Sequence, residues 1–327
     1  MNQPYNIPIA HQHLIEAAIR AANLGDVWTV KAGLGGGLST SVLYPLVVEG
    51  RHYVARITDP DDPHNNLAHE YAVMHAVNQL GIAPHLYYAD ASAGIAISDF
   101  VAGQPLFPWQ EDRPPLPHLL ADAVRTLHDS PALPKSHSIF EKAQTIFGWL
   151  PEPFRQQSLV AEAGTRMNEF ATLIHDPAYL RPGHGDLNPG NLLFDGARLW
   201  LIDWAAAGQE NYYFDLACCT NFFFHASAAA EMAFLQRYFT RRPTAEEMAI
   251  YHRMRIFCAI YYGLMFLYMS SATGTPLLPA TEIDQLPTHA AFMQLVGRGQ
   301  VRLDQPQEQQ RLGFIYLQQI AGMATVQ

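Results

Sequence analysis

Two carboxylates and an amide stand at unusual intervals in residues 184–204, which read HGDLNPGNLLFDGARLWLIDW. Asp186 is followed five residues later by Asn191, and Asp203 comes after a short apolar run. A turn needs the Asn, Pro and Gly residues of this stretch, but it does not need two carboxylates. Phosphoryl transfer does need them, because it requires an orienter for the attacking hydroxyl and Mg²⁺ held by oxygen ligands. The stretch therefore predicts a site in which Asp186 accepts the hydroxyl proton while Asn191 and Asp203 bind metal.

Two apolar segments must position these side chains: NLLFD and RLWLID, on either side of the turn DGA. Their pattern is typical of a β-hairpin, and a hairpin returns Asp203 to the loop that holds Asp186. The alternative is a polar turn followed by an unrelated strand end. The hairpin, together with His184 two residues before Asp186, favours the catalytic interpretation.

Three motifs follow one another along this region: HGDLNPGNLL, LIDWAAAG and FDLA. In combination they resemble the aminoglycoside phosphotransferase and choline kinase family, which shares the protein-kinase-like fold. The resemblance spans Gly33 to about Phe224. It implies an ATP-dependent enzyme that uses Mg²⁺.

For single residues, the resemblance implies that Asp186 is the catalytic base and that Asn191 and Asp203 are metal ligands. It implies that His184 holds the catalytic loop and that Asp215, in FDLA, braces this loop from below. The first three roles agree with those that the residue types predict.

A glycine-rich stretch, AGLGGGLSTS, occupies residues 32–41. It matches neither the P-loop motif nor the dinucleotide-binding fingerprint, and by itself it could be a flexible hairpin turn. Together with Asp186, Asn191 and Asp203, this stretch becomes a candidate phosphate-binding loop, because glycines let the backbone approach the phosphates and hydroxyls donate hydrogen bonds to them. The family has a similar turn between its first two strands. The candidates for phosphate contact are Gly36, Gly37, Ser39, Thr40 and Ser41.

Arg56, in the predicted strand HYVARIT, stands where a protein kinase would have Lys. This departure weakens a protein-kinase interpretation, but a guanidinium can bridge phosphate oxygens in a fork. Glu70, in the predicted helix LAHEYAVMHAV, is placed to pair with it. The alternative is a surface ion pair at a sheet edge.

The segment ISDFVAG, residues 97–103, lies where the sheet-rich part of the chain ends. In the family this segment offers backbone groups to adenine. The resemblance therefore implies Asp99 and Val101 as the adenine contacts.

The segment after the metal-binding Asp is rich in aromatic residues. The candidates for an acceptor pocket are Trp204, Tyr212, Tyr213, Phe222 and Tyr261. The alternative is that most of them are core residues. They fall where the choline kinase branch builds its aromatic pocket, and ring faces attract a quaternary ammonium. Ala205 replaces the acidic residue that relatives often have, so recognition would depend on the rings. We expect a small amino-alcohol such as choline or ethanolamine as acceptor, over a polycationic aminoglycoside.

The elements around these motifs predict an α+β, two-lobed protein-kinase-like fold. Short runs with strand composition, separated by turn residues, predict an antiparallel meander with one inserted helix in the N-terminal part. After residue 102 the pattern is mostly helical. We therefore expect an N-terminal nucleotide-binding lobe over residues 1–102 and a helical catalytic and acceptor-binding lobe over residues 103–327. Helices are expected at residues 9–24, 65–81, 116–130 and 159–176 and over most of the chain after residue 214, and strands at 27–32, 41–50, 52–58, 85–90 and 94–100.

Composition limits the partners. The 327 residues are 49% hydrophobic and 15% charged, with a formal net charge of −10, which indicates a globular protein. Nucleic acid and anionic membranes both bind basic surface patches, so neither is expected as a partner of this acidic chain. The charge suits a neutral or cationic small-molecule acceptor with a hydroxyl group.

Several features indicate a cytoplasmic protein. The N-terminus lacks the basic and apolar regions of a signal peptide. The most apolar run, Ile256–Met269, is shorter than a membrane span needs, so a buried core helix is expected. Cys218, Cys219 and Cys258 are odd in number and lack metal-ligand spacing, which favours buried free thiols. Two alternatives to a metabolite kinase remain: an antibiotic O-phosphotransferase, and a catalytically silent nucleotide-binding protein on the same fold.

Overall fold

A computed structural model describes the chain in two compact units. The described residues are 7–31, 33, 41–62, 65–104, 106, 115–224 and 227–323. Unit 1 comprises Met1–Ser136 and Asn188–Gly208, and unit 2 comprises His137–Leu187 and Gln209–Gln327.

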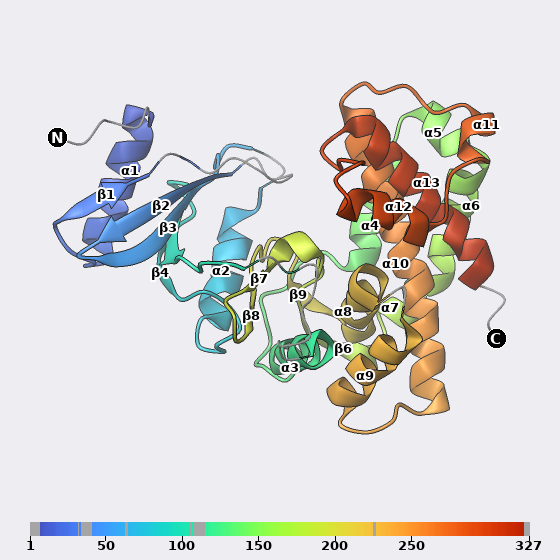
Figure 1. The fold of residues 1–327 in the computed structure, drawn as a ribbon, viewed down its shortest axis with the longest axis horizontal. Helices are drawn as coiled ribbons and strands as arrows, with labels where there is room; N and C mark the ends of the chain where they lie inside the picture. Colours follow the sequence, from blue (N-terminus) through green and yellow to red (C-terminus); the bar gives the residue numbers. More distant parts are fainter. Residues whose placement is uncertain are drawn as a thin grey trace. The chain divides into compact units, whose positions relative to one another are not determined.

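Unit 1 is built on a five-stranded antiparallel sheet in the order β1-β2-β3-β5-β4. Its strands are β1 (Trp28–Val30), β2 (Val42–Val48), β3 (Arg51–Ile57), β4 (Leu86–Asp90) and β5 (Ile95–Asp99). Its first three helices are α1 (Ile9–Ala21), α2 (Leu67–Val77) and α3 (Leu116–His128). The predicted antiparallel meander is confirmed for β1, β2 and β3, and the predicted helix α2 lies between β3 and β4 in the chain (Figure 1). Strand β3 pairs with β5, so the last two strands do not continue the meander.

Helices α1 and α2 pack on opposite faces of this sheet. Side chains alternate between the two faces along a strand. Ile95 and Ile97 of β5 belong to the cluster that includes α1, whereas Ala96 between them belongs to the cluster that includes α2. Asn66 caps α2, since its side chain accepts a hydrogen bond from the His69 N–H.

A short hairpin, β7 (Leu192–Phe194) and β8 (Leu199–Leu201), completes unit 1. Its strands are antiparallel with Leu193 opposite Trp200, so the predicted hairpin is confirmed. Backbone hydrogen bonds join it to the rest of the unit, from Leu201 N to Ile82 O and from Gln104 N to Phe194 O. For this reason the compact units do not coincide with a division at residue 102, and the lobe boundary drawn from composition stays a prediction.

Unit 2 is mainly helical and contains one pair of short strands, β6 and β9. These strands, at LRPG and GQEN, were not expected from the sequence. The elements are α4 (Ile139–Trp149), α5 (Glu152–Gln156), α6 (Ser158–Met167), α7 (Ala171–Ile174), β6 (Leu180–Gly183), β9 (Gly208–Asn211), α8 (Tyr212–Cys219), the π-helical turn η4 (Thr220–Phe224), α9 (Ala228–Phe239), α10 (Ala245–Ala272), α11 (Ala280–Ile283), α12 (His289–Gly297) and α13 (Pro306–Met323).

Helix α10 is the core of unit 2 and packs along α13 and α8 (Figure 1). The crossing with α13 is close: a Cβ on Gly263 would lie 2.6 Å from Leu317 Cδ2, and one on Gly313 would lie 2.9 Å from the Gly263 carbonyl oxygen. By length and composition alone α10 could cross a membrane, but 72% of its most apolar window is buried inside the protein. The predicted core helix at Ile256–Met269 is therefore confirmed.

Candidate active site

The candidate catalytic loop follows β6 in unit 2 and is held by Asp215. The carboxylate accepts hydrogen bonds from the His184 N–H (2.7 Å) and the Gly185 N–H (2.9 Å). Asp215 is 1% exposed and His184 is fully buried, so these charge-assisted bonds are shielded from water. Gly185 has φ +74°, a backbone conformation that favours glycine. The geometry is that expected of a brace beneath the loop, and the role of Asp215 in turnover stays a prediction.

Asp186, on the same loop, is half-buried and accepts a hydrogen bond from α10. The Tyr262 hydroxyl of α10 donates to Asp186 Oδ1 over 2.7 Å. Tyr262 is 1% exposed, and its hydroxyl oxygen also lies 3.7 Å from Cys218 Sγ. Burial raises the pKa of the Tyr262 hydroxyl, and the charge of Asp186 raises it further, so Tyr262 stays protonated and donates.

The three cysteine thiols are buried and free, as predicted. Cys218 Sγ lies 3.6 Å from Cys258 Sγ, behind Tyr262. Burial raises the pKa of the Cys218 thiol, which keeps it protonated and unreactive.

The two predicted metal ligands lie at the open end of the hairpin in unit 1. Ile202 N donates to the Asn191 carbonyl oxygen over 3.0 Å, so Asn191, just before β7, and Asp203, two residues after β8, lie at the same end of the hairpin. Asn191 is 8% exposed, whereas the Asp203 side chain is exposed. Asp203 has φ +66°, which is uncommon for a residue with a Cβ. Such backbone strain is concentrated at functional sites, and nothing in the sequence announces it.

Arg56 and Glu70 form the predicted ion pair, and the pair is buried. Arg56 Nη1 lies 2.6 Å from Glu70 Oε1, with side chains 19% and 6% exposed. The guanidinium also lies over the Tyr71 ring, at 5.6 Å from its centroid. The alternative of a surface ion pair is wrong, because both groups are shielded from water.

The charge of Arg56 is secured by its carboxylate neighbours. Burial lowers the pKa of Arg56, but the charge and hydrogen bond of Glu70 and the charge of Asp203 raise it above its usual value. The charge of Arg56 therefore interacts with the charges of both Glu70 and Asp203 in unit 1.

These residues of unit 1 fit a magnesium nucleotide. Arg56 Nη2 is buried and has no hydrogen-bond partner among the described residues, so a donor is available for a phosphate oxygen. The carboxylate of Asp203 and the amide of Asn191 are hard oxygen donors of the kind that Mg²⁺ prefers, and Mg²⁺ commonly takes only one or two protein ligands.

A contact that the sequence did not predict ties α2 to the segment after Asp203. His69 Nε2 lies 2.8 Å from the Ala207 carbonyl oxygen. Because His69 precedes Glu70, this hydrogen bond links the helix that carries Glu70 to the loop that follows the metal ligand.

The remaining nucleotide candidates are only partly described. Gly36, Gly37, Ser39 and Thr40 lie outside the described residues. Ser41 Oγ lies 2.7 Å from Thr58 Oγ1. The Asp99 N–H donates to the His85 carbonyl oxygen within the sheet, and Val101 follows the end of β5. The contacts of Asp99 and Val101 with adenine stay predictions.

The four predicted acceptor residues of unit 2 do not form one cluster. Tyr212 and Tyr213 stack at 4.2 Å in the first turn of α8. Phe222 lies ten residues after Tyr212, about 15 Å further along a helix, and packs edge-on against Tyr262 at 4.8 Å. Tyr261 packs edge-on against Phe214 at 5.6 Å, and Trp204 is buried in unit 1.

Among the four residues in unit 2, Phe222 and Tyr261 are the ones near the candidate base. Phe222 is half-buried and contacts the tyrosine that donates to Asp186. Burial raises the pKa of the Tyr261 hydroxyl, and the charge of Asp186 adds to this shift. Phe222 lies in the π-helical turn η4, a feature often found at functional sites.

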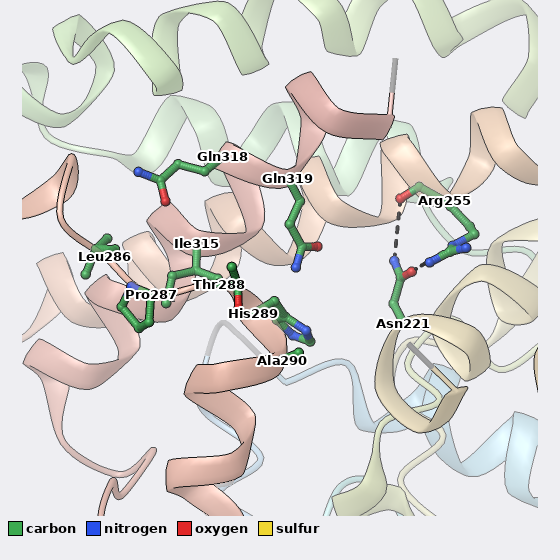
Figure 2. A pocket seen from close by; sticks show the side chains of 10 residues that line it. All are labelled: Asn221, Arg255, Leu286, Pro287, Thr288, His289, Ala290, Ile315, Gln318 and Gln319. Atoms are coloured by element: carbon green, nitrogen blue, oxygen red, sulfur yellow. Dashed lines mark hydrogen bonds between the residues drawn. The ribbon is translucent and has the colours of Figure 1, made fainter. Parts of the chain in front are cut away.

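A pocket of about 450 Å³ opens in unit 2 beside η4 (Figure 2). Figure 2 shows Asn221 and Arg255 on one side and the segment from Leu286 to Ala290 on the other. Arg255 is held by hydrogen bonds from Nε to Asn221 and from Nη1 to Glu231, both 3.1 Å. The lining residues are Asn221, Arg255, Leu286, Pro287, Thr288, His289, Ala290, Ile315, Gln318 and Gln319.

The pocket is close to the candidate base within unit 2. The His289 ring lies 4.9 Å from the Tyr316 ring, which lies 6.2 Å from the Tyr262 ring. Asn221 in its wall precedes Phe222. The sequence analysis missed this pocket because its residues form no motif and come from four separate parts of the chain.

Comparison with known proteins finds relatives that are similar in sequence and in fold. Residues 32–257 match the Phosphotransferase enzyme family. A thiamine kinase from Escherichia coli O157:H7 is 29% identical over 228 residues, which are 65% of this chain and 71% of that protein. Protein LicA from Haemophilus influenzae is 31% identical over 86 residues, 24% of this chain and 31% of that protein.

Two solved structures show the fold. A choline/ethanolamine kinase family protein from Mesorhizobium loti has a TM-score of 0.62 at 20% identity, over 94% of this chain and 99% of that one. LicA in complex with AMP has a TM-score of 0.61 at 18% identity, over 94% and 98% of the two chains. The predicted protein-kinase-like fold is therefore confirmed. Since the family match covers more than half of the chain, this protein belongs to the phosphotransferase enzyme family and is a small-molecule phosphotransferase.

Proposed function

We propose that this protein transfers the γ-phosphate of Mg-ATP to a hydroxyl group of a small metabolite. The observation that carries the proposal is the half-buried carboxylate of Asp186 on a loop whose backbone is fixed by Asp215. Asn191 and Asp203 are both retained, whereas a silent relative could lose either. The complex of LicA with AMP supports nucleotide use in this fold.

In the proposed reaction Asp186 takes the proton from the acceptor hydroxyl as its oxygen bonds to the γ-phosphorus. The bond from phosphorus to the β,γ-bridging oxygen breaks, and ADP leaves with that oxygen. Asn191 and Asp203 would hold Mg²⁺, which offsets the charge on the phosphate oxygens. Arg56 would bind phosphate through its guanidinium, oriented by Glu70.

The acceptor that we favour is a small alcohol with a cationic nitrogen, such as choline or ethanolamine. Similar proteins named for choline, ethanolamine and thiamine support this class. The half-buried ring of Phe222 lies next to Tyr262, close to the base, and could face such a cation. The alternative is an aminoglycoside-type antibiotic, which would require several carboxylates in its pocket.

Thiamine is a second candidate, favoured by the pocket beside η4. A volume of about 450 Å³ exceeds what choline fills, and the amides of Asn221 and Gln319 suit a hydrogen-bonding heterocycle. The positive charge of Arg255 is offset by Glu231 at 3.1 Å, so the wall does not repel a cationic ring.

A screen of acceptors tests the proposal. Purified protein with Mg-ATP should release ADP only when an accepted alcohol is present, and mass spectrometry should find its phosphate ester. Choline, ethanolamine, thiamine and an aminoglycoside are compared by kcat/KM. Nucleotide binding without acceptor-dependent ADP release would favour the silent binder, and efficient turnover of the aminoglycoside alone would refute the cationic-alcohol class.

The Asp186→Asn variant tests the base. Turnover should fall by about 10²–10⁴-fold, because general-base catalysis is lost. The affinity for Mg-ATP, measured by calorimetry, should stay within a few-fold of wild type, since Asp186 faces the acceptor. Substantial turnover by pure variant would contradict the assignment.

A further inference from the structure

We propose that Tyr262 is a positioning residue for phosphotransfer, holding the Asp186 carboxylate in the orientation that receives the acceptor hydroxyl. The inference rests on the proposed function. Its geometric basis is the 2.7 Å hydrogen bond from Tyr262 Oη to Asp186 Oδ1, which joins two residues of unit 2 that are 76 positions apart.

The direction of this hydrogen bond is fixed by chemistry. An ionised carboxylate can only accept, so the tyrosine hydroxyl is the donor. A carboxylate offers about four lone-pair sites on two oxygens, so the bond to Tyr262 does not compete with acceptance of a substrate proton.

Tyr262 is itself held firmly. Phe222 packs edge-on against its ring at 4.8 Å and Tyr261 at 5.2 Å. The next residue, Gly263, lies at the close crossing with α13, where a Cβ would meet Leu317 at 2.6 Å. A buried ring on a fixed helix has few alternative rotamers, so the hydroxyl is preorganised toward Asp186.

The loop therefore has two supports with different functions. Asp215 fixes the backbone at His184 and Gly185, and Tyr262 fixes the side chain of Asp186. Because the Asp186 side chain is held in one rotamer, little conformational entropy is lost when it takes up its catalytic orientation in each turnover.

The test compares Tyr262→Phe with Tyr316→Phe. Tyr316 is an equally buried tyrosine whose ring lies 6.2 Å from that of Tyr262, and its hydroxyl has no hydrogen-bond partner among the described residues. With the acceptor that wild type uses, Tyr262→Phe should lower kcat by about ten- to a hundredfold and leave the KM for ATP unchanged. Tyr316→Phe should keep the wild-type kcat.

Rescue by a conservative variant gives a readout that a loss of packing would not move. Site-specific replacement of Tyr262 by 3-fluorotyrosine keeps the shape of the side chain and retains the hydroxyl donor. It should keep the wild-type kcat, whereas Tyr262→Phe should lose it. A loss of kcat in the 3-fluorotyrosine variant would count against the positioning role even if the Phe variant fails to fold.

The outcomes separate this inference from the proposed function. If wild type phosphorylates no acceptor, the proposed function fails and the positioning role falls with it. If wild type is active but Tyr262→Phe keeps its kcat, only the positioning role is overturned. A fall in kcat of the same size in Tyr316→Phe would also overturn it, because packing alone would then explain the loss.

Discussion

Asp215→Asn should uncouple the catalytic loop from α8 with little change in shape. The native carboxylate accepts two backbone N–H groups, at 2.7 and 2.9 Å. The amide of Asn has one oxygen, so it can accept from His184 or from Gly185 but not from both at full strength. The other N–H then faces an NH₂ group and loses its partner in a buried site.

The magnitude follows from these two bonds. A hydrogen bond to a charged group contributes about 1.5–3 kcal/mol, and a buried unsatisfied N–H costs about 1–3 kcal/mol. Removing the buried charge of Asp215 recovers part of this loss, because an ion in the interior is poorly solvated. We expect the free energy of unfolding to fall by about 2–4 kcal/mol. We expect kcat to fall at least about tenfold as the loop that carries Asp186 shifts.

Urea denaturation followed by circular dichroism measures the first effect, and steady-state phosphorylation of the accepted alcohol measures the second. Asp195→Asn is the matched control. Its carboxylate also accepts from two backbone N–H groups, those of Ala197 and Arg198, but in the turn of the β7–β8 hairpin. That variant should lose stability and keep kcat. An Asp215→Asn variant with wild-type stability and kcat would refute the bracing role.

Three further predictions concern the nucleotide site and the pH response. Asp203→Ala should weaken metal-dependent nucleotide binding itself, and unchanged Mg-ATP affinity in calorimetry would contradict its metal role. Arg56→Ala should raise the KM for ATP, and Arg56→Lys should restore it only in part, because one ammonium cannot reproduce a bidentate fork. In a double-mutant cycle, Glu70→Ala should raise the KM for ATP little beyond the effect of Arg56→Ala, whereas additive effects would show that the two residues act independently. Burial raises the pKa of Glu210 to about 7 against the attraction of Lys142, so the folded state binds the extra proton. The free energy of unfolding should therefore fall as pH rises from about 4.5 to about 7, and Glu210→Gln should flatten that window in urea titrations.

Local signals in the sequence were sufficient for much of the fold. Alternating apolar residues in β2 and β3 and the Asn66 cap act within a few residues, so the pattern reports them directly. The hairpin that returns Asp203 to Asn191 is of the same kind. Strands β6 and β9 escaped notice because LRPG and GQEN have no strand composition and form a pair only where the folded chain brings them together.

The site depends on longer-range contacts that a pattern does not carry. Tyr262 lies in a uniformly apolar run, where a tyrosine is indistinguishable from a core residue until Asp186 is placed 2.7 Å away. The left-handed backbone of Asp203 is hidden because its residue type does not require it. Tyr212 and Phe222 are both aromatic and close in sequence, yet one begins α8 and the other lies in η4.

The crossing of α10 and α13 at Gly263 and Gly313 has a consequence for protein engineering. Any side chain at either position would separate the two helices, since its Cβ would lie within 2.9 Å of atoms of the opposite helix. Tyr262 directly precedes Gly263 at this crossing. Substitutions that change the packing of α10 against α13 would therefore displace Tyr262 as well. Directed evolution toward new acceptors should therefore hold both glycines constant and randomise the pocket segment from Leu286 to Ala290 instead. We expect active variants from such libraries to concentrate in that segment.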